Sequence, residues 1–230
     1  MTAKVSGLDK STDYTVYVYP ETPLGTVGES LTLDIKTTGL KEELTEEEQA
    51  KPIPTADILD IQFINDNIDD LSPRQTKAGT FGTPSLTAIG SGYKYASFDG
   101  SDDAYRYNIN DVYSKYTSTL TVESMFRLNS SKSASIFSGE EAGGTAIRYA
   151  DGNVYFDIYV NGAYRIVSAP VNTGEWIHAV GTYDGKAVKL YVNGEPVAEL
   201  AVSGKIGWPP SNVTEEGRAF AVGADIAWNN

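Results

Sequence analysis

Residues 175–200 read EWIHAVGTYDGKAVKLYVNGEPVAEL, and this stretch decides the fold. Asp184-Gly185 and Asn193-Gly194 supply the positive φ angles that two-residue hairpin turns require. Between these turns, successive side chains alternate between two faces, as they do along a β-strand. The pattern therefore predicts strands over 176–183 and 187–192, and the start of a third strand after the second turn.

Short runs of the same kind fill residues 56–230. The expected strands there are 58–63, 95–98, 104–107, 120–128, 135–138, 154–160 and 164–168. Turns rich in glycine separate them, and helical periodicity is almost absent. The sequence therefore predicts an all-β fold, an antiparallel jelly-roll sandwich.

Composition narrows the possible partners. The chain has 230 residues and no cysteine, so disulfides cannot stabilise it even if it is exported. It carries 18 basic and 31 acidic side chains, a net charge of −13, which argues against a nucleic-acid partner. No run approaches the roughly 18 apolar residues that cross a bilayer, so no membrane span is expected.

Six motifs of residues 57–230 follow the order found in laminin-G-like, concanavalin A-type jelly rolls. They are LDIQF (59–63), ASFDGSDDAYRY (96–107), STLTVESMFRLN (118–129), SIFSG (135–139), the hairpin of 176–194 and FAVGAD (220–225). The domain resembles that family, whose members mostly bind ligands and seldom catalyse. The family's closing strand is not found before residue 230, so the final strand is expected to be missing.

The part before residue 56 differs in character. Residues 1–38 resemble the last part of a fibronectin type III domain, with Tyr14 as the corner tyrosine. Residues 39–55 are predicted to be an acidic linker with a short helix capped by Thr45 and Glu48. The alternative is an acidic tract that binds cations.

The start of the chain lacks the apolar core of a signal peptide, so we expect an internal fragment of a longer protein. Similar pairs of fibronectin-like and jelly-roll domains accompany surface hydrolases, including calcineurin-like phosphoesterases. The resemblance therefore implies a secreted or wall-attached bacterial parent and an extracellular location, with neighbouring domains of the same chain as partners.

The chain contains 15 tyrosines, and several fall on strands expected to be adjacent. The candidate ligand-binding residues are Tyr149, Tyr155, Tyr159, Tyr164 and Trp208. Tyr155 and Tyr159 share a strand face, so their rings could stack on a sugar or a peptide. The alternatives are that strands simply favour tyrosine, and that Trp208 covers the core.

Carboxylate oxygens suit calcium, which makes this ion a candidate cofactor; the alternative is that the acidic residues are ordinary loop residues. By resemblance to pentraxins, its ligands would be Glu140 and Glu141 after one strand and Asp225 and Asn229 after another. A second acidic cluster consists of Asp99, Asp102 and Asp103. Asp99 is expected to accept backbone N–H groups in a turn rather than to bind an ion.

Catalytic patterns are scarce. Glucanases with this jelly roll need carboxylates in an E-x-D-x-x-E string, which this chain lacks. Glu123 and Asp157 each stand alone on a strand, and the single histidine, His178, has no serine or cysteine motif beside it. We expect a noncatalytic carbohydrate-binding module. The alternatives are a structural spacer or protein-adhesion domain, and a glycan-cleaving enzyme that uses Glu123.

Overall fold

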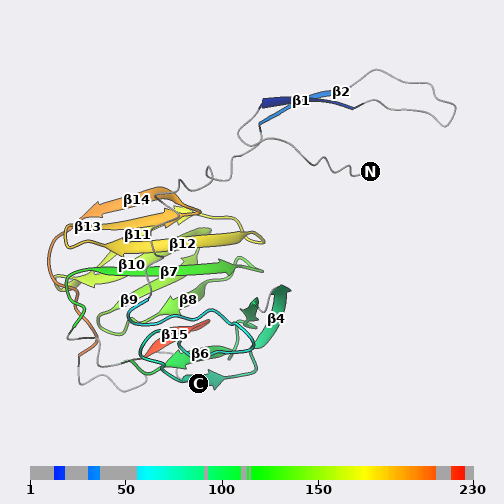
Figure 1. The fold of residues 1–230 in the computed structure, drawn as a ribbon. Helices are drawn as coiled ribbons and strands as arrows, with labels where there is room; N and C mark the ends of the chain where they lie inside the picture. The colour runs from blue at the N-terminus through cyan, green and yellow to red at the C-terminus, as the bar shows by residue number, and fades with distance from the viewer. Residues whose placement is uncertain are drawn as a thin grey trace. The chain divides into compact units, whose positions relative to one another are not determined.

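The computed structural model describes residues 13–18, 31–36, 56–90, 93–109, 113, 115–210 and 219–225. The chain divides into two compact units, Met1–Pro54 and Thr55–Asn230 (Figure 1). Strands are the regular elements of the described residues, which confirms the predicted all-β class. No helix in this part of the chain is long and apolar enough to cross a membrane.

The described residues of the first unit form one antiparallel hairpin. It consists of β1 (Asp13–Val18) and β2 (Leu31–Lys36), with Tyr14 opposite Ile35. A corner tyrosine at Tyr14 would tie its hydroxyl to the backbone near Leu8, which lies outside the described residues. The predicted acidic helix around Thr45 lies outside them too, so both remain predictions.

The second unit contains an antiparallel sheet of seven strands. In spatial order these are β11 (Ala163–Pro170), β10 (Asn153–Val160), β9 (Thr145–Ala150), β8 (Ala134–Ser138), β15 (Phe220–Val222), β6 (Ala104–Tyr107) and β3 (Ala78–Phe81). β15 pairs with β6 on one side and with β8 on the other. Strands that lie far apart in the sequence of this unit are therefore neighbours in one sheet.

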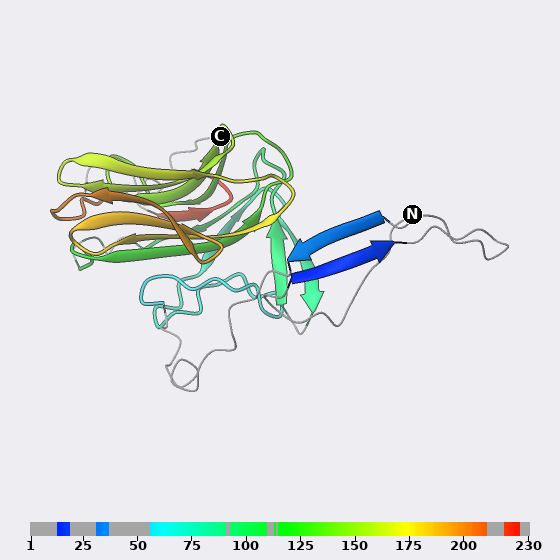
Figure 2. The same cartoon turned by 90° about the horizontal axis from the view of Figure 1, so that it is seen from above.

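A second antiparallel sheet of four strands lies against the first (Figure 2). Its order is β14 (Glu195–Ala201), β13 (Ala187–Val192), β12 (Trp176–Tyr183) and β7 (Leu120–Arg127). The predicted strands 176–183 and 187–192 are confirmed. A separate hairpin consists of β4 (Ser85–Gly90) and β5 (Tyr93–Ser97).

Strand alternation sorts the side chains between the core and the two outer faces. On β10, Val154, Phe156, Ile158 and Val160 are fully buried between the sheets. A second cluster is mainly aromatic and includes Tyr107, whose hydroxyl donates to the Ile68 carbonyl at 2.6 Å. The two clusters give the second unit its own hydrophobic core.

The predicted strand over 58–63 is wrong. Its backbone is held by loops instead of a ladder: the Asp60 N–H donates to the Asp70 carboxylate at 2.9 Å, and the Asp60 carbonyl accepts from Leu71 at 2.7 Å. Phe63 has a φ of 50°, which ends any extended run. β3 and β4 were not predicted, whereas β9 is the strand on which Tyr149 was expected. Residues 226–230, where a closing strand would start, lie outside the described residues.

Candidate binding surface

The outer face of the seven-stranded sheet carries the polar side chains of β10. Because its even-numbered residues point into the core, Tyr155, Asp157 and Tyr159 point outward. Asp157 stands in the middle, opposite Ala146 of β9 and Ile166 of β11. The predicted common face of Tyr155 and Tyr159 is therefore present, with a carboxylate between the two rings.

Asp157 is only 2% exposed although it lies on the outer face. Its carboxylate accepts from Nε of Arg148, and from Nη2 of the same side chain at 3.4 Å. The Arg148 guanidinium also lies over the Tyr155 ring, 4.4 Å from its centroid, which is a cation–π contact. Burial raises the pKa of Asp157, while the ion pair with Arg148 opposes that rise.

Glu140 follows β8 and faces the same region. One of its carboxylate oxygens, Oε2, is buried and has no hydrogen-bond partner among the residues that the structure describes. Burial raises the pKa of Glu140 to about 7, and the negative charges of Asp157, Asp225 and Glu141 act in the same direction. An acceptor that is buried and unsatisfied is costly, so it marks a place where a donor or cation would be stabilised.

Tyr159 and Tyr164 form the aromatic end of this face. They are cross-strand partners, and their rings meet edge to face at 5.0 Å between centroids. The Tyr164 hydroxyl lies 3.0 Å from the backbone nitrogen of Gly143 and 3.1 Å from its carbonyl oxygen. Tyr164 therefore ties β11 to the loop that follows Glu140. We define the outer-face cluster as Glu140, Arg148, Tyr155, Asp157, Tyr159 and Tyr164.

Two predicted ligand-binding residues lie elsewhere. Tyr149 is 2% exposed and belongs to the core between the sheets, because its position on β9 points inward. Trp208 packs on the core, stacks on Tyr113 at 5.1 Å and donates from its indole to the Tyr116 carbonyl at 2.6 Å. That arrangement fits the alternative in which Trp208 covers the core.

Of the predicted calcium ligands, Glu140, Glu141 and Asp225 lie near one another, since the charges of the last two act on Glu140. Asp225 accepts from the Ser138 hydroxyl at 3.4 Å, which places it beside the end of β8. Asn229 lies outside the described residues.

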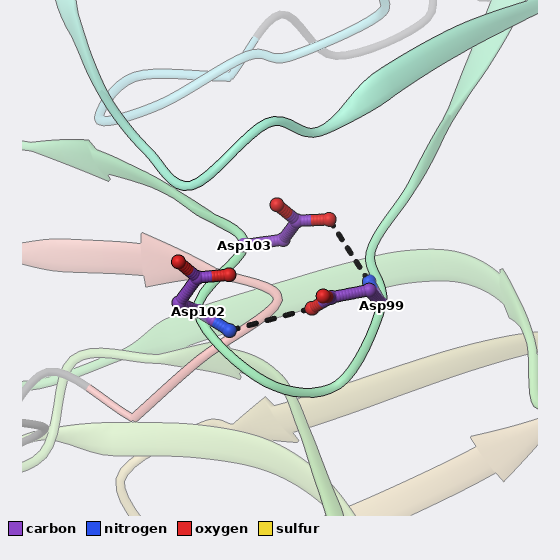
Figure 3. A group of neighbouring side chains, drawn as sticks. All are labelled: Asp99, Asp102 and Asp103. Carbon is purple, nitrogen blue, oxygen red and sulfur yellow. Dashed lines mark hydrogen bonds between the residues drawn. The ribbon is translucent and has the colours of Figure 1, made fainter.

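A second acidic group consists of Asp99, Asp102 and Asp103, which offer one oxygen each within 4.8 Å of one another (Figure 3). Asp99 accepts from the backbone of Ser101 at 2.7 Å, as predicted for a turn residue. Asp103 accepts from the backbone of Asp99 and of Thr83. The carboxylates of Asp99 and Asp103 hold the loop together, and the three carboxylates could also hold a metal ion.

A family model for the concanavalin A-like lectin/glucanases superfamily matches residues 98–229. The chain belongs to the concanavalin A-like lectin/glucanases superfamily. The match lies within the second unit, so it gives no support to the resemblance of residues 1–38 to fibronectin type III domains. No curated protein sequence matches the chain.

Solved structures with a similar fold include binding domains of botulinum neurotoxins. The receptor-binding domain of the mosaic serotype C/D toxin is 18% identical, with a TM-score of 0.58, over 74% of this chain and 43% of that one. The serotype DC domain in complex with SialylT is 15% identical, with a TM-score of 0.56, over 72% and 43%. The same domain in complex with rat synaptotagmin II is 13% identical, with a TM-score of 0.54, over the same shares.

These likenesses show the fold alone, and this chain spans less than half the length of those domains. The superfamily is named after lectins and glucanases, so the position of the acidic side chains matters. Glu123 lies on the outer face of β7, where its carboxylate is 2.8 Å from Nε2 of His178. Asp157 lies on the outer face of the other sheet, so the core separates these two carboxylates. They therefore cannot act on one glycosidic bond as a pair.

Proposed function

We propose that residues 56–230 form a noncatalytic carbohydrate-binding module of an extracellular or wall-attached protein. Membership of the concanavalin A-like lectin/glucanases superfamily supports a binding role. One observation carries the proposal: the outer-face cluster combines partly exposed tyrosine rings with charged groups that are poorly hydrated. Asp157 and Glu140 both lie there, and neither has a role in the hydrophobic core.

The mechanism follows from the chemistry of a sugar. The apolar face of a pyranose ring can stack on Tyr155 or Tyr164, which present apolar area with a polar edge. Its hydroxyls can donate to the carboxylate of Glu140 and accept from Arg148, which the buried Asp157 carboxylate holds in place. A neutral glycan also suits a chain with a net charge of −13, because it pays no electrostatic penalty on approach.

We further propose calcium as a cofactor held by Glu140, Glu141, Asp225 and Asn229. The buried, unpaired Oε2 of Glu140 supports this, since a divalent cation would satisfy it. A calcium titration tests the idea: the melting temperature should rise in the wild type and stay unchanged in Glu140→Gln. If calcium does not change the melting temperature of the wild type, the calcium proposal is wrong. The glycan proposal would not be affected by that result.

The glycan proposal is tested with a glycan array, followed by calorimetry on the glycans that bind. Tyr155→Ala and Asp157→Asn should each weaken binding at least tenfold. The matched control is Tyr191→Ala, which removes a tyrosine from the four-stranded sheet and should leave affinity unchanged. An array without any bound glycan would favour the alternative, a structural spacer or protein-adhesion domain.

A further inference from the structure

The outer face of the seven-stranded sheet carries two large apolar side chains on β11. Val167 and Ala169 of this strand point into the core, so Tyr164 and Ile166 point outward. Ile166 is 46% exposed and Tyr164 is 37% exposed. An aliphatic side chain with this much surface in water gains free energy when an apolar group of a ligand covers it.

Strand register places Ile166 beside the charged groups of the outer-face cluster. β9, β10 and β11 lie side by side, and Ile166 is the cross-strand partner of Asp157 (Figure 1). The Cβ atoms of such partners lie about 5 Å apart. The Asp157 carboxylate accepts from Nε and Nη2 of Arg148, which reaches it from β9. An aliphatic side chain and a guanidinium therefore flank the same buried carboxylate.

Arg148 can serve a ligand as well as Asp157. Its side chain is 32% exposed, whereas that of Asp157 is 2% exposed. A guanidinium has five N–H groups, so one guanidinium can hold Asp157 and also donate to an acceptor on a ligand. Glu140 interacts electrostatically with both groups. A neutral acceptor therefore suits this position better than a carboxylate, which would meet two negative charges.

An acetamido substituent of a sugar matches this arrangement. Its carbonyl oxygen is a neutral acceptor, and its methyl group is apolar. The two groups share one carbon atom and point in different directions, so the oxygen can accept from Arg148 while the methyl group packs on Ile166. Ile166 has no planar ring on which a pyranose could stack, so a small apolar group is the better match for it.

We propose that the outer-face cluster selects glycans that carry an acetamido group, and that Ile166 is a specificity-determining residue. The inference rests on the proposed function, because it names the class of glycan that the same site binds. Tyr155 and Tyr164 remain the surfaces on which the sugar ring stacks. A hydroxyl in place of the acetamido group would leave Ile166 in contact with water.

Oligosaccharides that differ only in the substituent next to the anomeric carbon test this preference. Each set contains an acetamido, a hydroxyl and an amino member, in the gluco and in the galacto series. Calorimetry on the 230-residue chain should show at least tenfold tighter binding of an acetamido member than of its hydroxyl counterpart. The covered methyl group accounts for about fourfold, and the hydrogen bond from Arg148 accounts for the remainder.

Ile166→Ser should reduce the preference about fourfold, because it removes the contact with the methyl group. The matched control is Val197→Ser, which replaces a branched aliphatic side chain of similar exposure, 42%, on β14 of the other sheet. The control should keep the preference of the wild type. Both replaced side chains are exposed, and circular dichroism will verify that each variant is folded.

Saturation-transfer NMR gives a second readout on the same complexes. The acetyl methyl protons should be the most strongly saturated protons of the ligand in the wild type and in Val197→Ser. In Ile166→Ser their saturation should fall relative to that of the ring protons, because the ring still stacks on the tyrosines.

Three results would overturn the inference and leave the proposed function standing. The first is glycan binding in which no acetamido member is preferred over its hydroxyl counterpart. The second is a preference that Ile166→Ser leaves unchanged, which would place the acetamido group elsewhere. The third is tightest binding of the amino members, which would show that the acidic side chains select the ligand by charge. If no glycan binds at all, the proposed function is wrong and the inference is wrong with it.

Discussion

Glu140 and Asp157 carry negative charge in a place that water reaches poorly. Asp157 is compensated by Arg148, whereas Oε2 of Glu140 meets no hydrogen-bond partner in the described part of the chain. Burying a charge without a partner costs free energy, and such a cost commonly persists where a ligand later compensates it. At the scale of single residues, we therefore expect the buried charges of the outer-face cluster to lower the stability of the fold and to favour ligand binding.

Glu140→Gln should stabilise the protein at neutral and higher pH. The folded-state pKa of Glu140 is raised from 4.5 to about 7, so its carboxyl destabilises the fold progressively as pH rises through that interval. Below 4.5 the group is protonated in both states and the variant should match the wild type. Above pH 7 the gain should be about 2 kcal/mol, since part of the charge still meets water.

Urea unfolding at pH 4, 6 and 8 measures this difference. Glu199→Gln is the control, because it removes a carboxylate from an exposed position on β14. Its stability should follow that of the wild type at all three values. A Glu140→Gln variant with the same pH dependence as the wild type would show that water reaches this carboxylate freely.

The sequence predicts the orientation and burial of some side chains better than those of others. Alternation along one strand correctly put Tyr155 and Tyr159 on one face, because that inference needs only local spacing. Tyr149 could not be placed in the same way, since its direction depends on the register between β9 and β10. The burial of Glu140 depends on residues far away in the chain, such as Asp225, and no local pattern indicates it.

At the scale of elements, β12 and β10 approach closely across the core. A Cβ atom added at Gly181 of β12 would lie 2.2 Å from the ring of Phe156 on β10. Phe156 is fully buried and cannot move aside without displacing its neighbours. The glycine therefore sets how near the two sheets can come.

Gly181→Ala should lower the free energy of unfolding by about 3 kcal/mol, because the methyl group overpacks the core. Gly79→Ala on β3 is the matched control: its added Cβ would meet its nearest neighbour at 3.6 Å, an ordinary contact. That variant should stay within about 0.5 kcal/mol of the wild type. Chemical denaturation measures both, and equal effects would show that Phe156 can repack around the methyl group.

Elements closed by tight turns were predicted best. The hairpin of β12 and β13 follows from Asp184-Gly185 and from alternation, which act over neighbouring residues. The strand expected over 58–63 failed because Asp70, a residue outside the run, binds the backbone of Asp60. Side chains that capture backbone groups from a distance compete with strand pairing, and a hydrophobic pattern does not reveal them.

At the scale of the whole molecule, the described core lies within one of the two units. Both hydrophobic clusters consist of residues from Ile58 onward, so they belong to the unit Thr55–Asn230. The described hairpin of the first unit has Leu33 exposed at 55%. A two-stranded hairpin is marginal in water by itself, so the first unit is expected to add little to the stability of the second.

Residues 55–230 should therefore fold without residues 1–54. The shortened chain should keep a β-type circular dichroism spectrum and melt within about 4 °C of the full chain, which corresponds to about 1 kcal/mol for a domain of this size. Residues 1–54 added as a separate peptide should not change that melting temperature. A drop of more than about 10 °C, reversed by the added peptide, would mean that the first unit completes the fold of the second.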